Sequence, residues 1–124
     1  IKDTEEYAKN HKDVDISKIN EYFDTDRVWE RRLGIISLTR LVEEDYDFCI
    51  LCIKKVMYDK RLIIQKATGI VIEKLYQKNP KDTFKFLLDA NNFEQIPSIV
   101  MSYAYVSMND EEREIIRRGE KGNV

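Results

Sequence analysis

The chain has 124 residues, with 21 basic and 23 acidic side chains interspersed along it. This length suits one compact domain, and the nearly neutral charge lacks the strong positive balance of a dedicated nucleic-acid-binding protein. No apolar run approaches the roughly 20 residues that span a bilayer, so we expect no membrane contact.

Apolar residues recur at helical spacing along the chain, and no segment alternates with a period of two. The pattern predicts helices over residues 13–24, 26–43, 45–59, 61–79, 80–92, from 93 or 97 to 108, and 109–119, with a further one over 1–10. Thr25 or Asp26 is expected to cap the helix over 26–43, and Pro80 to begin the one over 80–92. We therefore predict an all-α chain of about six to seven helices.

Cys49 and Cys52 form a C-x-x-C pair inside an apolar helical run. A structural zinc site usually has about four ligands, and the remaining donor of the usual nitrogen or sulfur type is His11. A redox pair normally lies at a helix N-terminus, which lowers the pKa of a thiol. We therefore predict two reduced core cysteines, no metal or other cofactor, and a reducing compartment, the cytoplasm.

A weak internal repeat relates residues 27–41 to residues 61–75 at an offset of 34, so that Arg32 falls on Lys66. A further shift of 34 brings residues 96–106 into the same frame. A helix-pair period in this range is typical of a HEAT-like, right-handed solenoid of antiparallel helix pairs. Unrelated amphipathic helices can also be slid into partial register, so this alternative stays open.

Three segments resemble signatures of the AlkD-type DNA alkylation repair family, in family order. Residues 28–37, VWERRLGIIS, are similar to its W-x-R-R-x-A-I-I-S segment, and residues 62–80 are similar to its I-x-K-A-x-G-W-x-L-R-E segment. Residues 86–119 match its closing pattern, which contains M-P-R-x-x-L-R-Y-A. The resemblance is strongest over residues 24–119. It implies a single HEAT-like domain over residues 1–124, related to glycosylases that remove cationic alkylated purines by cleaving the N-glycosidic bond.

The chain departs from this family at positions that, as the resemblance implies, line the DNA-facing groove. The family has a tryptophan at the position of Ile70 and an arginine at that of Glu73. The two arginines of its closing motif correspond to Ser98 and Ser102. We interpret these four residues as lost groove positions, because glutamate in place of arginine repels a phosphate.

The resemblance also implies an acidic motif, W-D-x-V-D, about 30 residues before Trp29. The nearest local likeness is HKDVDIS, with Asp13 and Asp15, at about half that distance. We interpret these two carboxylates as charges at a helix start, so no catalytic residue is predicted in this chain. Because the chain begins at Ile1, we expect it to be truncated at the N-terminus, and upstream residues could supply the motif.

Arg32 and Lys66 match basic positions that contact the DNA backbone in the family. They are our candidates for backbone binding, together with Arg31, which we expect to be the solvated member of its pair. Both matched residues could instead be solvated or pair with neighbouring carboxylates. We expect Trp29 to be a packing anchor, and one of Tyr103 and Tyr105 to be buried.

Three functions follow from these observations. The first is a binding module without competent catalysis, for a protein partner or, weakly, for the DNA backbone. The second is an alkylpurine DNA glycosylase whose acidic motif lies upstream, and the third is a helical assembly module without a nucleic-acid role. An exposed repeat face at the N-terminal end also predicts self-association.

Overall fold

The computed structural model describes residues 16–122, which form helices and connecting loops and no strand. In chain order the elements are α2 (Ile16–Phe23), α3 (Val28–Ser37), the 3-10 helix η1 (Leu38–Arg40), α4 (Tyr46–Val56), α5 (Leu62–Lys78), α6 (Pro80–Phe93), α7 (Ser98–Ser107) and α8 (Asp110–Gly122). The all-α prediction is confirmed for this part of the chain. The helix expected over 1–10, His11, Asp13 and Asp15 lie outside the described residues.

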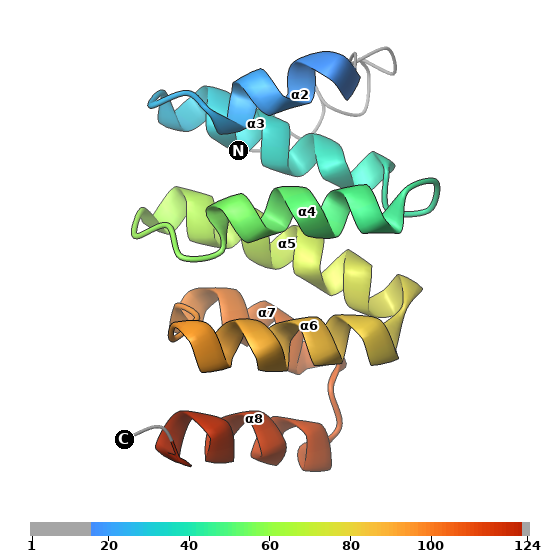
Figure 1. Ribbon diagram of the computed structural model, residues 1–124, viewed down its shortest axis with the longest axis vertical. Coiled ribbons are helices and arrows are strands. Elements are labelled where there is room, and N and C mark those ends of the chain that lie inside the picture. The colour runs from blue at the N-terminus through green and yellow to red at the C-terminus, as the bar shows by residue number, and fades with distance from the viewer. Residues whose placement is uncertain (1–15, 123–124) are drawn as a thin grey trace.

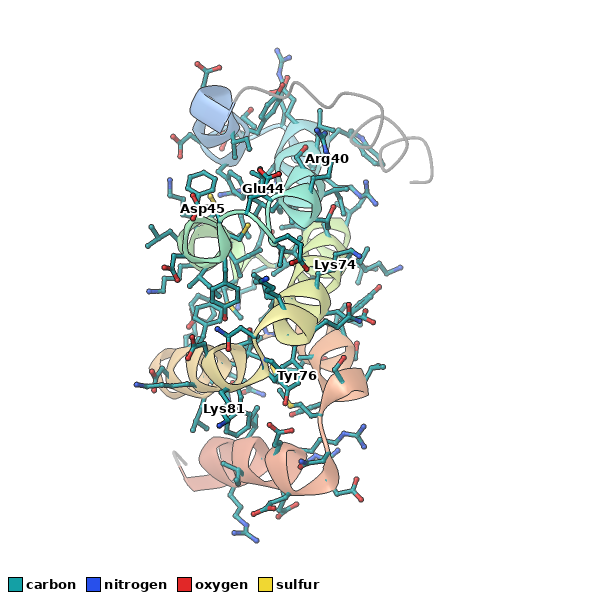
Figure 2. All side chains as sticks on the ribbon, turned by 90° about the vertical axis from the view of Figure 1, so that its right-hand side faces the viewer. Arg40, Glu44, Asp45, Lys74, Tyr76 and Lys81 are labelled. Carbon is teal, nitrogen blue, oxygen red and sulfur yellow. The ribbon has the colours of Figure 1, made fainter. Side chains whose placement is uncertain are left out.

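The helices form two layers that are stacked along the longest axis of the molecule. Figure 1 shows α2, α4 and α6 in front of α3, α5 and α7, with α8 below α6, and Figure 2 shows the two layers edge on. Helix α5 packs against α3 on one side and against α7 on the other, while α6 packs against α8. The long helix α5 is therefore the centre of its layer.

Side-chain caps explain where α6 and α8 begin. Asn79 accepts a hydrogen bond from the backbone N–H of Asp82, and Pro80 is the first residue of α6, as predicted. At α8, the Asn109 side chain accepts from the N–H of Glu112 (2.8 Å), and the Glu112 carboxylate accepts from the N–H of Asn109 (3.2 Å). This reciprocal pair is a capping box.

Helix α3 is shorter than the helix predicted over 26–43. Its N-cap is Arg27, without a side-chain cap, so the expectation that Thr25 or Asp26 caps it is wrong. The Thr25 hydroxyl instead accepts a hydrogen bond from the N–H of Arg27 (3.1 Å), the residue just before the first residue of the helix. At the other end, the Ser37 hydroxyl donates to the Leu33 carbonyl (2.7 Å), and the chain tightens into η1.

A continuous apolar core runs between the two layers. The deeply buried side chains of this core include Ile19, Phe23, Ile35, Leu38, Ile53, Ile64, Ile72, Leu75, Leu87, Ile96 and Ile116. Burial of such apolar surface is the main favourable term in folding. Among the described helices, none is both long and apolar enough to cross a membrane.

Candidate functional site

The helices α3, α5 and α7 begin alike, which fixes how their residues correspond. Their N-cap residues are Arg27, Arg61 and Pro97, none of which caps its helix with a side chain. Arg32, Lys66 and Ser102 are therefore each the fifth helical residue. The N-caps Arg27 and Arg61 are 34 residues apart, which matches the predicted offset. The N-caps Arg61 and Pro97 are 36 residues apart, two more than the offset of 34 predicted for the third segment.

Five of the residues singled out from the sequence lie on neighbouring helices of one layer. Lys66, Ile70 and Glu73 follow one another at helical spacing on α5, and Ser98 and Ser102 do so on α7. Lys66 and both serines are exposed, while Ile70 and Glu73 are half-buried. We call this surface the α5/α7 face. It carries one ammonium group and one carboxylate among these five side chains.

The Ser102 hydroxyl is bonded to its own helix. It donates to the carbonyl oxygen of Ile99 in the preceding turn, at 2.6 Å. Such a bond turns the hydroxyl back toward its own helix. At this position the α5/α7 face therefore offers a short neutral side chain.

Arg31 and Arg32 lie differently from what the sequence predicts. Arg32 is buried, with 3 % of its surface exposed, because it lies on the same side of α3 as Ile35 and Ile36. Arg31 is half-buried, and its Nη1 lies 3.3 Å from Oδ2 of Asp59. Arg31 is thus the more exposed of the two, as expected, but it is half-buried and paired with Asp59. Phosphate binding by either arginine or by Lys66 stays a prediction.

Asp59 joins three segments of the chain, a role that the sequence patterns did not suggest. Its carboxylate accepts from the backbone N–H of Arg61 (2.9 Å), from Nε and Nη2 of Arg61, and from Arg31. Arg61 Nη1 in turn donates to the carbonyl oxygen of Asp26 (3.3 Å), next to α3. In the sequence, the feature that indicates this role is an aspartate two residues before a helix N-cap, where its side chain can accept a hydrogen bond from the backbone.

The surroundings of Asp59 keep its carboxylate ionised. Burial alone would raise the pKa of Asp59, but hydrogen bonds from Arg61 and the charges of Arg61 and Arg31 together lower it. The carboxylate is nearly buried, with 9 % of its side chain exposed. Asp59 is thus occupied as a structural acceptor and is poorly placed to act as a general base.

Three aromatic residues complete the description of this layer. Trp29 is 57 % exposed, so its prediction as a packing anchor is wrong. It lies in the first turn of α3, at the end of the helix. Tyr103 and Tyr105 are both half-buried, so the expectation that one of them is buried is also wrong. The Tyr105 ring faces the Arg117 guanidinium, with 5.5 Å between the guanidinium carbon and the ring centroid.

The prediction that Cys49 and Cys52 lie in the core as free thiols is confirmed, since both are buried. Burial, followed by the neighbouring Cys52 and Asp45, raises the pKa of Cys49 to about 12. Cys49 Sγ donates to the carbonyl oxygen of Leu38 at 3.6 Å. Residues 16–122 contain no cluster of histidine, cysteine, aspartate and glutamate that could hold a metal ion.

Comparison with known proteins identifies the family of the chain. The model of a family described as DNA alkylation repair enzyme matches residues 4–108 of the 124 residues. Neither a search of curated proteins nor one of solved structures found a significant match. The family match covers most of the chain, including α3, α5 and α7 with the α5/α7 face. The chain belongs to the DNA alkylation repair enzyme family.

Proposed function

We propose that the chain is a binding module of this family, without competent catalysis of its own, which binds a protein partner or, weakly, the DNA backbone. The observation that supports this proposal most strongly is the charge of the α5/α7 face. Among the five residues that define this face, Lys66 has an exposed ammonium group, Glu73 has a carboxylate, and Ser98 and Ser102 are neutral. A surface that follows a phosphate backbone normally presents several cations.

The requirements of glycosidic bond cleavage support the same proposal. The reaction needs a carboxylate that stabilises the developing sugar cation, with cationic side chains on the flanking phosphates. Asp59, which lies next to the candidate Arg31, is held by two arginines. Glu73 takes a place where, as the resemblance implies, the family has an arginine. The arrangement therefore suits binding better than base excision.

The release of methylated bases tests the loss of catalysis. We expect the full-length protein to release no 7-methylguanine from alkylated duplex DNA beyond the spontaneous rate of a sample without protein. Robust release would overturn the proposal and support the alternative of an alkylpurine DNA glycosylase. A W-D-x-V-D motif in the reading frame upstream of Ile1 would point the same way, and a start codon just upstream of Ile1 would argue against it.

The salt dependence of DNA binding separates a weak backbone contact from none. Each phosphate that is neutralised contributes a slope of about −0.9 to a plot of log affinity against log salt. We expect a small slope that is reduced by Lys66→Ala and unchanged by Lys81→Ala, which removes an exposed lysine of the other layer. Absent binding at low salt would leave a protein-binding or assembly module.

Two substitutions that add an arginine test the DNA reading through an increase in affinity, which is easier to measure than the loss of weak binding. Ser102→Arg restores, as the resemblance implies, a basic side chain of the family, and Leu51→Arg adds the same charge to exposed α4. If the α5/α7 face still has the shape of a DNA-binding surface, the first substitution will raise DNA affinity more than the second. Equal increases in DNA affinity would mean that the added positive charge acts in the same way wherever it lies on the surface.

Self-association through an exposed repeat face is a separate part of the proposal. Stacked helical repeats bury their faces against one another, so a repeat face without a neighbour would favour association. Sedimentation equilibrium over a wide range of protein concentrations tests this directly. We expect a concentration-dependent rise in average mass, and a clean monomer at the highest concentration would contradict it.

A further inference from the structure

A groove lies between α4 and α6, in the layer opposite to the α5/α7 face. The two helices lie side by side and run in the same direction (Figure 1), and the space between them has a volume of about 550 Å³. Its apolar and aromatic lining consists of Tyr46, Ile50, Met57, Tyr58, Phe86 and Ala90. We call this the α4/α6 groove. Its volume lies within the range of about 300–1,000 Å³ that ligand sites have.

Two tyrosines brace the groove near its two ends. The Tyr46 hydroxyl lies 2.7 Å from Oγ1 of Thr83, whose own proton goes to the Leu75 carbonyl at 2.9 Å, so Tyr46 is the donor. The Tyr58 hydroxyl donates to the carbonyl oxygen of Ala90 at 2.6 Å. Both hydroxyl protons are thus used within the protein. These bonds fix the two rings in the lining of the groove, where they offer apolar surface to an occupant.

The charged side chains of the groove are unequal in number. The carboxylates are Asp47, Asp82 and Asp89, and the ammonium groups are Lys54 and Lys85. None of the five forms an ion pair within 4.0 Å with a residue of the described range 16–122. The Asp82 carboxylate accepts a hydrogen bond from Nδ2 of Asn79 at 2.8 Å, and the other four groups are available to an occupant. The surplus of one carboxylate repels phosphate and attracts basic groups.

The position of each carboxylate shows which of them the fold itself explains. Asp47 and Asp82 lie in the first turns of α4 and α6, where the helix dipole favours negative charge. Asp89 lies further along α6, before its last turn, where the helix dipole has little effect. The dipole therefore does not account for the exposed Asp89 carboxylate, which lines the groove one helical turn after Lys85.

We propose that the α4/α6 groove binds an extended segment of a partner protein, with apolar side chains on the aromatic lining and basic side chains beside Asp47, Asp82 and Asp89. From Tyr46 to Tyr58 the groove is roughly 18 Å long at the rise of an α-helix. An extended peptide of about five residues covers that length. The proposal does not rest on the function proposed for the α5/α7 face, since it concerns the opposite layer.

Synthetic pentapeptides with blocked ends test the proposal on the full chain. The basic probe is RLALK, and the matched probes QLALQ and ELALE keep the apolar residues while changing the charge. Amide NMR spectra recorded during titration report both the affinity and the place of binding. We expect RLALK to shift the signals of residues in α4 and α6, and to bind at least about tenfold more tightly than ELALE.

Charge-neutral variants of the groove complete the test. Asp47→Asn combined with Asp89→Asn changes two exposed side chains without ion pairs, so folding should be preserved. We expect about fivefold weaker binding of RLALK, corresponding to the loss of two exposed charge pairs. The control combines Asp110→Asn with Glu111→Gln, which makes the same charge change on α8, and should leave the affinity unchanged.

Three results would overturn the proposal. One is the absence of signal shifts in α4 and α6 with RLALK at concentrations up to about 5 mM, beyond which binding is weaker than any useful recognition. Another is equal affinity for RLALK, QLALQ and ELALE, which would remove the role of the carboxylates. The last is an equal loss of affinity for RLALK in the groove variant and in the α8 control, which would mean that only the net charge of the protein matters.

Discussion

The ring of Tyr103 lies directly against the Cα atom of Gly69, so that α7 and α5 meet there without an intervening side chain. A Cβ atom at residue 69 would fall 2.6 Å from Cγ of Tyr103 and 3.0 Å from its Cβ, with Cδ1 nearer still. The contact lies between the two helices that carry the α5/α7 face. Gly69 therefore sets the distance between Lys66 on one helix and Ser102 on the other.

Gly69→Ala is expected to destabilise the protein despite the better helix propensity of alanine. Overpacking against Tyr103 costs about 1–3 kcal/mol, and the propensity gain of about 1 kcal/mol offsets only part of it. Urea denaturation measures the difference in the free energy of unfolding. In a Tyr103→Ala background the same substitution should cost nothing or stabilise, because the obstructing ring is gone. An equal cost in both backgrounds would contradict the close contact.

Asp59→Asn is expected to lower the free energy of unfolding by about 1–3 kcal/mol, because it leaves two part-buried arginines without their anionic partner. The control, Glu30→Gln, breaks an exposed pair with Arg27 and should cost at most about 1 kcal/mol. Similar costs for both substitutions would mean that the Asp59 contacts add no more than a surface pair.

The Asp59 contribution should also depend on pH in a defined direction. The pKa of Asp59 is lower in the folded protein than in the unfolded chain, so folding is favoured when the carboxyl is ionised. The stability difference between the wild type and Asp59→Asn is fully present above the ordinary carboxyl pKa of about 4. It shrinks as the pH falls through the lowered pKa. Denaturation curves of both proteins over this range check the sign.

Cys49 and Cys52 should resist thiol reagents as long as the protein is folded. Both are buried, and burial raises the pKa of Cys49 to about 12, so almost no Cys49 thiolate exists near neutral pH. We expect Ellman's reagent to react with them only as fast as the protein opens, and rapidly in urea. Fast labelling of the native protein would contradict the burial of the pair.

The helices could be predicted from the sequence because periodicity and caps are local properties. Pro80 after Asn79 marks the start of α6 in the sequence, and the structure places it there. The burial of Cys49 and Cys52 followed likewise from the apolar residues around them on α4. Such signals need only the few residues on either side.

The exposures of Trp29, Arg31 and Arg32 could not be predicted in the same way. Periodicity within α3 tells which residues share a side, but neighbouring helices decide which side is covered. Arg32 lies on the covered side, and Arg31 meets Asp59, which comes from a turn 28 residues later. Trp29 lies at the N-terminal end of α3, where its exposure depends on how far the neighbouring helices extend. The need for glycine at residue 69 comes from Tyr103, which lies on another helix and 34 residues later in the chain.

Tyr76→Phe is expected to loosen α8 while leaving the rest of the stack intact. The Tyr76 hydroxyl donates to Oε2 of Glu112 at 2.6 Å, and Tyr76, labelled in Figure 2, joins α5 to the first turn of α8. Loss of a hydrogen bond to a charged acceptor costs about 1.5–3 kcal/mol. Amide hydrogen exchange should become faster in α8 and stay unchanged in α3. The control Tyr58→Phe removes a bond to α6, so it should speed exchange in α8 less than Tyr76→Phe does.

The same pair predicts how this stabilisation responds to alkali. Burial, then the hydrogen bond to Glu112 and its charge, raises the pKa of Tyr76 above its ordinary value. The unfolded chain therefore loses this proton first, at about pH 10, and folding becomes less favourable above it. The stability advantage of the wild type over Tyr76→Phe should accordingly shrink as the pH rises beyond that point. A constant advantage in alkaline denaturation experiments, or unchanged exchange in α8, would show that the bond between Tyr76 and Glu112 does not hold α8 in place.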